Sequence, residues 1–198
     1  SQANSIAVLG AGLVGALAYT FSESFWFSAV EGEVYAMSSF FTALVFWAIL
    51  RWEDVADERH GYRWLLLIAY LIGLSIGVHM LNLLAIPAIV YVVYFKKYKK
   101  ISWKGFVAAG ILSVIILSFI MYIIIPWIVK LSSMFELTFV NSFGLPFNSG
   151  TIVYFLLLIG GIVWGLHYTR KKAMPIINTS ILAFTFILIG YSSFAMLV

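Results

Sequence analysis

Six long apolar runs without Lys, Arg, Asp or Glu constrain the fold more than any other feature of this sequence. They cover residues 5–22, 34–50, 64–95, 105–129, 151–169 and 173–198. A helix needs about 20 residues to cross the hydrocarbon core of a membrane. The chain is 63% hydrophobic and only 10% charged, which leaves too little polar surface to cover a soluble domain. The sequence therefore predicts an all-α integral membrane protein with a single transmembrane helical domain over residues 1–198.

The basic residues predict how often the chain crosses the membrane. Eleven of the twelve Lys and Arg residues lie in three clusters, at 51–63, 96–104 and 170–172. Cytoplasmic loops are rich in Lys and Arg, so we place all three clusters on the cytoplasmic side. Each interval between clusters must then hold an even number of crossings. The 32-residue run 64–95 therefore becomes a hairpin of two short helices that turns near His79.

We accordingly expect about seven membrane-embedded helices, with outer loops at 22–33 and 127–150. The expected helices cover residues 5–21, 34–50, 64–78, 80–95, 105–126, 151–168 and 176–197. The sequence starts without an initiator Met or a signal peptide and ends in apolar residues. We therefore expect an internal or processed piece of a longer membrane protein.

The glycines near the start of the chain have two interpretations. Gly10-x-Gly12-x-x-Gly15 matches the dinucleotide-binding fingerprint, but that fold needs further strand–helix units and this chain offers apolar helices. Small residues four positions apart let helices approach closely in lipid, and Gly73-x-x-x-Gly77 repeats that spacing. We interpret both motifs as helix-packing sites and expect no nucleotide cofactor.

The predicted outer loop SESFWFSAVEGEVY, residues 22–35, holds the first candidate site residues. Glu31 and Glu33 are either solvated acids at the start of a helix or the acidic rim of an outward-facing cavity. Trp26 and Tyr35 are either an interfacial aromatic belt or the lining of that cavity.

The second candidate group lies in the hairpin. His79 is the only residue of the run 64–95 that carries charge near neutral pH, and helical spacing would group it with Ser75 and Asn82. An ionisable group within a membrane segment is by default a functional candidate. A histidine that is hydrogen-bonded to a neighbouring helix is the alternative.

The sequence lacks the residues that several other kinds of chemistry require. The chain has no cysteine, and His60, His79 and His167 are too scattered in the sequence to suggest a metal site. No Walker loop or G-x-S-x-G motif is present. The basic tract FKKYKK, residues 95–100, is typical of an anchor on anionic lipid rather than of a nucleic-acid site. We expect no metal and no nucleic-acid partner.

Three segments resemble a known family: FWFSAVEGEVYAMSSFF, LIGLSIGVHMLNLLAIPAIV and the closing GYSSFAML. They are similar to multi-spanning bacterial membrane proteins, common in the Bacteroidetes and long filed as a domain of unknown function. An animal relative of that family is a protein O-mannosyltransferase that acts on plexin-type receptors. The resemblance covers nearly the whole chain.

The resemblance implies a partial bundle of the GT-C type, the architecture of integral glycosyltransferases. Such an enzyme passes a sugar from a polyprenyl-phosphate donor to an acceptor on the outer face, here of the bacterial inner membrane. It implies that Glu31, Glu33 and Tyr35, with His79 and Asn82, line the donor or acceptor cavity. The acidic Asp-Ser-Gly-Glu-like run of the family is absent here, so we expect the catalytic base in the rest of the parent chain and this chain alone to be inactive.

Two other functions remain open at this point. His79 and the acids could lie on the path of a small-solute transporter or channel. The chain could instead be a non-catalytic scaffold subunit of an envelope complex. Against a transporter, the sequence shows no internal repeat, and the acids gather on one predicted side of the membrane rather than at its centre.

Overall fold

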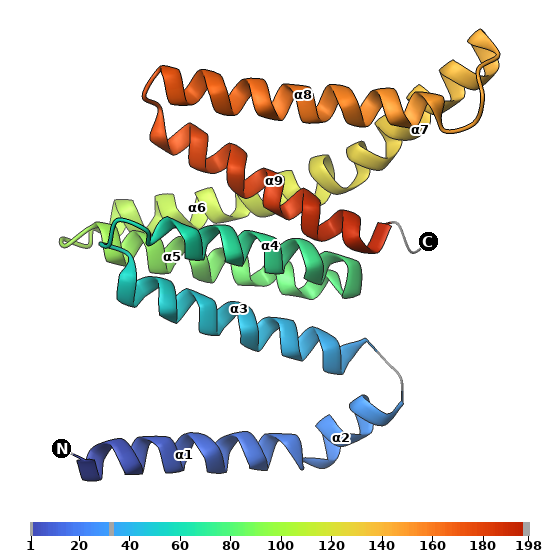
Figure 1. Cartoon of the computed structure of the whole chain (residues 1–198). Helices are drawn as coiled ribbons and strands as arrows, with labels where there is room; N and C mark the ends of the chain where they lie inside the picture. The colour runs from blue at the N-terminus through green and yellow to red at the C-terminus, as the bar shows by residue number, and fades with distance from the viewer. Residues whose placement is uncertain (1, 32–33, 196–198) are drawn as a thin grey trace.

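The computed structural model describes residues 2–31 and 34–195, and these residues form helices without a strand. The α-helices are α1 (Gln2–Thr20), α2 (Glu23–Val30), α3 (Tyr35–Val55), α4 (Tyr62–Val78), α5 (Ala85–Lys97), α6 (Trp103–Phe119), α7 (Ile125–Phe143), α8 (Ser149–Lys171) and α9 (Pro175–Ala195). A 3₁₀ turn, η1 (Met80–Leu84), joins α4 to α5, and a π-helical turn, η2 (Ile120–Ile124), joins α6 to α7. Figure 1 shows most of the helices running roughly side by side.

The helices confirm the predicted class of a multi-pass membrane protein. In the described residues, five helical segments are long and apolar enough to cross a membrane: Tyr35–Val55, Met80–Lys97, Trp103–Phe143, Ser149–Lys171 and Pro175–Ser192. A sixth crossing is possible through Asn4–Thr20 and Glu23–Val30, which are bent by 55° at their junction. Helix α4 is apolar but shorter, at 17 residues.

The run 64–95 is broken where the sequence predicted a turn. Helix α4 ends at Val78, and His79 takes an extended conformation with φ −160° and ψ 131°. Figure 1 shows the chain turning back through η1, so that α4 and α5 run in opposite directions. Pro87 lies in the first turn of α5, where a missing N–H group leaves no helical hydrogen bond unmade.

The structure differs from the predicted outer loop 127–150, because α7 continues to Phe143. Helices α6, η2 and α7 form one run of 41 residues, about 62 Å long and twice the thickness of a membrane core. Four partly buried side chains at helical spacing explain the difference: Ile128, Leu131, Phe135 and Phe139. They form an apolar stripe on α7, the helix that packs against α8. The predicted loop 22–33 also contains a helix, α2, over residues 23–30.

A carboxylate from α7 accepts hydrogen bonds from the start of helix α8. Glu136 Oε1 accepts a hydrogen bond from the Asn148 N–H at 2.5 Å, and Oε2 accepts from the Thr151 N–H at 2.9 Å and from the Thr151 hydroxyl at 3.1 Å. The first N–H groups of a helix have no partner within that helix. Glu136 supplies acceptors for two N–H groups at this end and fixes the angle between α7 and α8.

Helices α4 and α9 pack closely because glycines face backbone on both sides. A Cβ atom at Gly73 would collide with the Ile187 carbonyl, and a Cβ atom at Gly190 with the Tyr70 carbonyl. The predicted packing role of Gly73 is therefore confirmed. The chain's buried core lies beside this contact and includes the fully buried Val45.

The glycines of α1 do not pack in this way. A Cβ atom at Gly10, Gly12 or Gly15 would meet no described neighbour within 4 Å, so the predicted close packing is not found there. The motif also lies inside a helix rather than after a strand, which removes the context that a dinucleotide site requires. Figure 1 shows α1 apart from the other helices and joined to them through α2.

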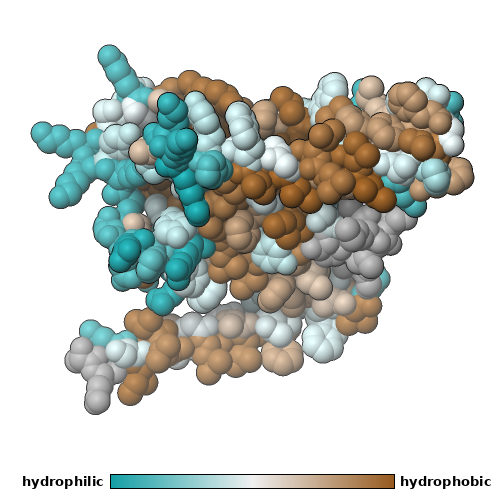
Figure 2. Space-filling model, turned by 45° about the horizontal axis from the view of Figure 1, so that its top comes forward, coloured by the Kyte–Doolittle hydropathy of each residue, from teal (hydrophilic) through white to brown (hydrophobic). Residues whose placement is uncertain are grey.

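The three basic clusters gather at one end of the bundle. Figure 1 places the α3–α4, α5–α6 and α8–α9 connections at the same end, and Figure 2 shows hydrophilic residues concentrated there. Lys96 Nζ lies 3.5 Å from a carboxylate oxygen of Asp57, which joins the second cluster to the first. The shared end is what a common membrane face for the three clusters requires.

Candidate functional site

The polar candidates meet at the end of the bundle opposite the basic clusters. The N-terminus of α3 brings Tyr35 beside His79, with ring centroids 5.8 Å apart and planes inclined by 45°. The break after α4 places His79 there, because the chain leaves the helix at this residue and turns into η1.

His79 also has a defined orientation. Its Nδ1 atom accepts a hydrogen bond from the Leu81 N–H at 3.1 Å and caps η1. In a neutral imidazole with an accepting Nδ1, the hydrogen lies on Nε2. The half-buried His79 therefore presents an N–H donor beside the Tyr35 ring.

Asn82 lies in η1 and is almost fully enclosed, with 3% of its surface exposed. Its Oδ1 atom accepts a hydrogen bond from the Thr42 hydroxyl of α3, while its Nδ2 atom has no partner in the described structure. An unpartnered buried donor costs about 1–3 kcal/mol. The amide therefore ties η1 to α3, and its Nδ2 atom stays enclosed without a partner in the described structure.

Thr42 is a site residue that the sequence reasoning missed. One face of α3 carries Tyr35, Ser38, Ser39 and Thr42, because the last three follow Tyr35 by three, four and seven residues. That spacing was the available signal. Ser75, which the sequence grouped with His79, does not join the site, because its fully buried hydroxyl donates to the Ile72 carbonyl of its own helix at 2.8 Å.

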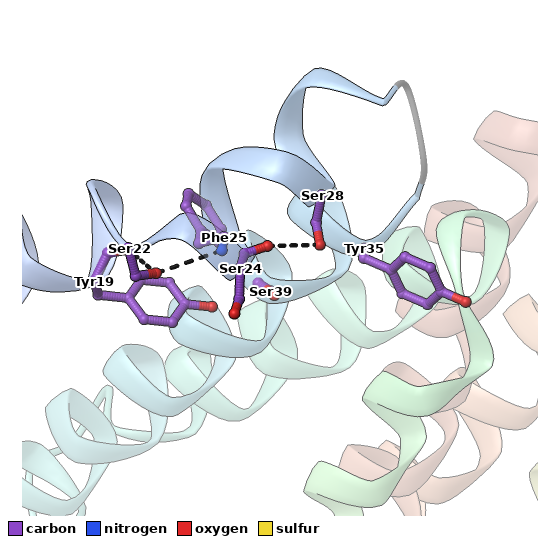
Figure 3. Close-up of a pocket in the computed structure, with 7 residues that line it drawn as sticks. All are labelled: Tyr19, Ser22, Ser24, Phe25, Ser28, Tyr35 and Ser39. Carbon is purple, nitrogen blue, oxygen red and sulfur yellow. Dashed lines mark hydrogen bonds between the residues drawn. The ribbon is translucent and has the colours of Figure 1, made fainter.

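A cavity of about 220 Å³ lies between the α1–α2 junction and the start of α3. Figure 3 shows the seven side chains that line it: Tyr19, Ser22, Ser24, Phe25, Ser28, Tyr35 and Ser39. Tyr35 is shared between this cavity and the contact with His79. We call it the hydroxyl cavity, since six of its seven residues carry a hydroxyl group.

The remaining predicted residues lie outside this arrangement or outside the described residues. Trp26 is 56% exposed and stacks on Phe21 with centroids 6.3 Å apart, and it does not line the cavity. Glu31 is exposed and ends α2, where its N–H donates to the Phe27 carbonyl at 3.1 Å. Glu33 lies outside the described residues.

The described residues hold no group of three or more His, Asp or Glu side chains placed to bind a metal ion. The donors described around Tyr35 and His79 are instead hydroxyl groups, the imidazole of His79 and the amide of Asn82. Such groups bind uncharged polar ligands and phosphate oxygens by hydrogen bonding.

The fold and this polar end define a multi-pass helical membrane protein with a candidate site at one face of the bundle. A family model described as the protein O-mannosyl-transferase TMEM260 N-terminal domain matches residues 1–102, just over half of the chain. The chain belongs to this family, and the predicted relation to an animal O-mannosyltransferase is confirmed. It is a glycosyltransferase-related membrane protein. No curated protein and no solved structure matches the chain.

The matched segment contains all six predicted site residues. It covers α1 to α5 and ends in the connection before α6, so it includes the hydroxyl cavity, the Tyr35–His79 pair and Asn82. The part of the chain that carries the family likeness is thus the part that carries the candidate site.

Proposed function

We propose that this chain is the membrane-embedded part of a GT-C-type glycosyltransferase that takes a sugar from a polyprenyl-phosphate donor. The acceptor lies on the outer face of a bacterial inner membrane, and the three basic clusters face the cytoplasm. The observation that carries the proposal is the pairing of Tyr35 with His79 within the family segment, at the end opposite the basic clusters. The positive-inside rule supports the assignment of that end to the outer face.

The donor groups suit a lipid-linked phosphate. When the acceptor oxygen attacks the anomeric carbon of the sugar, the bond from that carbon to the phosphate oxygen breaks and the phosphate leaves with the electron pair. Hydrogen-bond donors that face the phosphate stabilise this developing charge. In our proposal, the Nε2–H group of His79 and the Tyr35 hydroxyl serve this purpose, and Asn82 supports them by tying η1 to α3 through Thr42.

The acceptor must lose its hydroxyl proton in the same reaction, and a carboxylate is the usual base. We retain Glu31 and Glu33 as the candidates within this chain, and Trp26 as a contact for the lipid or the sugar. A base supplied by the remaining part of the parent protein is compatible with the same donor site. Binding of the donor is therefore the property to test first.

The test is the melting temperature of the purified chain in detergent with polyprenyl-phosphate mannose added. A ligand at one hundred times its Kd stabilises the folded state by about 2.7 kcal/mol. That corresponds to a rise of roughly 5–10 °C for a chain of this size. We expect the rise in the wild type and a clearly smaller one in His79→Ala and Tyr35→Phe.

His60→Ala is the matched control, because His60 lies in the α3–α4 connection at the basic end. It should leave the rise unchanged. If no polyprenyl-phosphate sugar raises the melting temperature of the folded wild-type chain, the donor site is refuted. The transporter and scaffold functions would then be the ones to pursue.

A further inference from the structure

We propose that the hydroxyl cavity holds the sugar ring of the lipid-linked donor, while the phosphate lies beyond Tyr35, near His79. This inference rests on the proposed function and adds a division of the donor site into a sugar part and a phosphate part. The volume of about 220 Å³ is below the roughly 300–1,000 Å³ of cavities for drug-sized ligands, so it suits one ring rather than a lipid tail.

The cavity has hydroxyl groups that the protein leaves unused. The Ser22 and Ser28 hydroxyls donate to the Tyr19 and Ser24 carbonyls, at 2.7 and 2.9 Å. The hydroxyls of Tyr19, Ser24 and Ser39, in contrast, have no hydrogen-bond partner within the described part of the chain. Figure 3 shows these three groups gathered on the same side of the cavity.

Free hydroxyl groups match the chemistry of a sugar. Each Ser or Tyr hydroxyl both donates and accepts, as does each hydroxyl of a sugar, so a ring in the cavity can satisfy both partners. An apolar lipid chain in the same place would leave these groups without partners, which is unfavourable. The Tyr19 and Phe25 rings, with centroids 4.6 Å apart, add an apolar surface for the C–H face of a sugar ring.

The lining argues against a phosphate in this cavity. None of the seven lining residues is Lys, Arg or His, so the cavity offers no basic side chain to offset the charge of a phosphate. Glu23 follows the lining residue Ser22 directly and adds negative charge to the same segment. The donor assigned to the phosphate is instead the imidazole of His79, whose ring lies against that of Tyr35.

Tyr35 joins the two parts of the site. Its ring lines the hydroxyl cavity, and in Figure 3 its hydroxyl points away from the serines. The same ring lies 5.8 Å from the His79 ring, centroid to centroid. A sugar phosphate that passes along Tyr35 would place its ring among the serines and its phosphate near the imidazole.

The experiment measures the affinity of the chain in detergent for polyprenyl-phosphate mannose and for polyprenyl phosphate without a sugar. Tyr19→Phe, Ser24→Ala and Ser39→Ala each remove one free hydroxyl with little change of shape. We expect each to weaken binding of the sugar-bearing lipid about two- to tenfold and to leave the sugar-free lipid unaffected. Ser180→Ala is the control, because that hydroxyl is exposed and donates to the Ile176 carbonyl.

The outcomes separate this inference from the proposed function. If the three variants bind the sugar-bearing lipid as the wild type does, the sugar lies elsewhere, and the donor site itself stands. If the variants lose affinity for both lipids equally, the cavity binds a part of the donor that both lipids contain, and the inference is also wrong. If the wild type binds neither lipid, the proposed function fails and this inference fails with it. Unchanged binding of the sugar-free lipid shows that each variant is folded.

Discussion

Replacing Thr42 with Val should destabilise the protein more than replacing Asn82 with Leu, although both changes break the same hydrogen bond. In the folded chain, Thr42 donates to Asn82 Oδ1, and the Thr42 hydroxyl also lies 3.0 Å from the Ser38 carbonyl. The Asn82 Nδ2 atom is buried without a partner. The two substitutions therefore leave different groups behind.

The magnitudes follow from those groups. Thr42→Val leaves both polar atoms of the Asn82 amide buried without partners, which costs about 1–3 kcal/mol. Asn82→Leu removes an unpartnered donor, and the single hydroxyl hydrogen of Thr42 can turn to the Ser38 carbonyl, 3.0 Å away, so the change in stability should be close to zero or favourable. The double variant should resemble Asn82→Leu alone. In a chain of this size, 1 kcal/mol shifts the melting temperature by roughly 2–4 °C.

Thermal unfolding in detergent, followed by tryptophan fluorescence, measures all three variants. We expect Thr42→Val to melt several degrees lower than the wild type, and Asn82→Leu to melt at or above it. A larger loss of stability in Asn82→Leu than in Thr42→Val would refute the reasoning, because the amide would then contribute more to stability than it costs.

Two further predictions concern the fold. Gly73→Ala should lower the stability by about 1–3 kcal/mol, because the new methyl group meets the backbone of α9. In Gly12→Ala the methyl group meets nothing within 4 Å, so the melting temperature should stay unchanged or rise slightly. Equal melting temperatures of the two variants would contradict the close α4–α9 contact. Glu136→Ala should loosen the start of α8 by about 1–3 kcal/mol and speed hydrogen exchange at the Asn148 and Thr151 amides, and Glu136→Gln, which keeps one acceptor oxygen, should do so less. Exchange rates that do not respond to Glu136→Ala would show that the carboxylate does not hold that end.

Much of the fold was predictable because membrane-spanning helices are a local property of the chain. Apolar length identified most of the helices, although not α2 or most of α7. The positions of Lys and Arg indicated that the run 64–95 had to turn back near His79. The loop predicted over 127–150 is wrong over 127–143, where the sequence carries an apolar stripe at helical spacing. The stripe of Ile128, Leu131, Phe135 and Phe139 repeats at helical spacing. The turn residues Gly144, Pro146, Asn148 and Gly150 near the end of the segment suggested a loop over its whole length instead.

The candidate site was predictable only in its parts. His79 was a candidate because an ionisable group within an apolar run is costly. Asn82 was added by its spacing from His79, and Tyr35 by its place in the predicted outer loop and by the family resemblance. Their relative positions depend on the extended conformation at His79 and on the packing of α3 against α4 and η1. Helical spacing would have grouped His79 with Ser75, whose hydroxyl turned out to bond within its own helix.

The sequence by itself determined that lipid is the main solvent of this protein, that its apolar runs form helices and that its positive charges gather at one end. These properties follow from composition and from distances along the chain. Only the tertiary structure decided which groups face one another: the ring of Tyr35 beside His79, the Thr42–Asn82 hydrogen bond and the unused hydroxyls between α1, α2 and α3. The physical reason is that a hydrogen bond or a cavity depends on angles between helices, and those angles are set by packing contacts between residues far apart in the sequence.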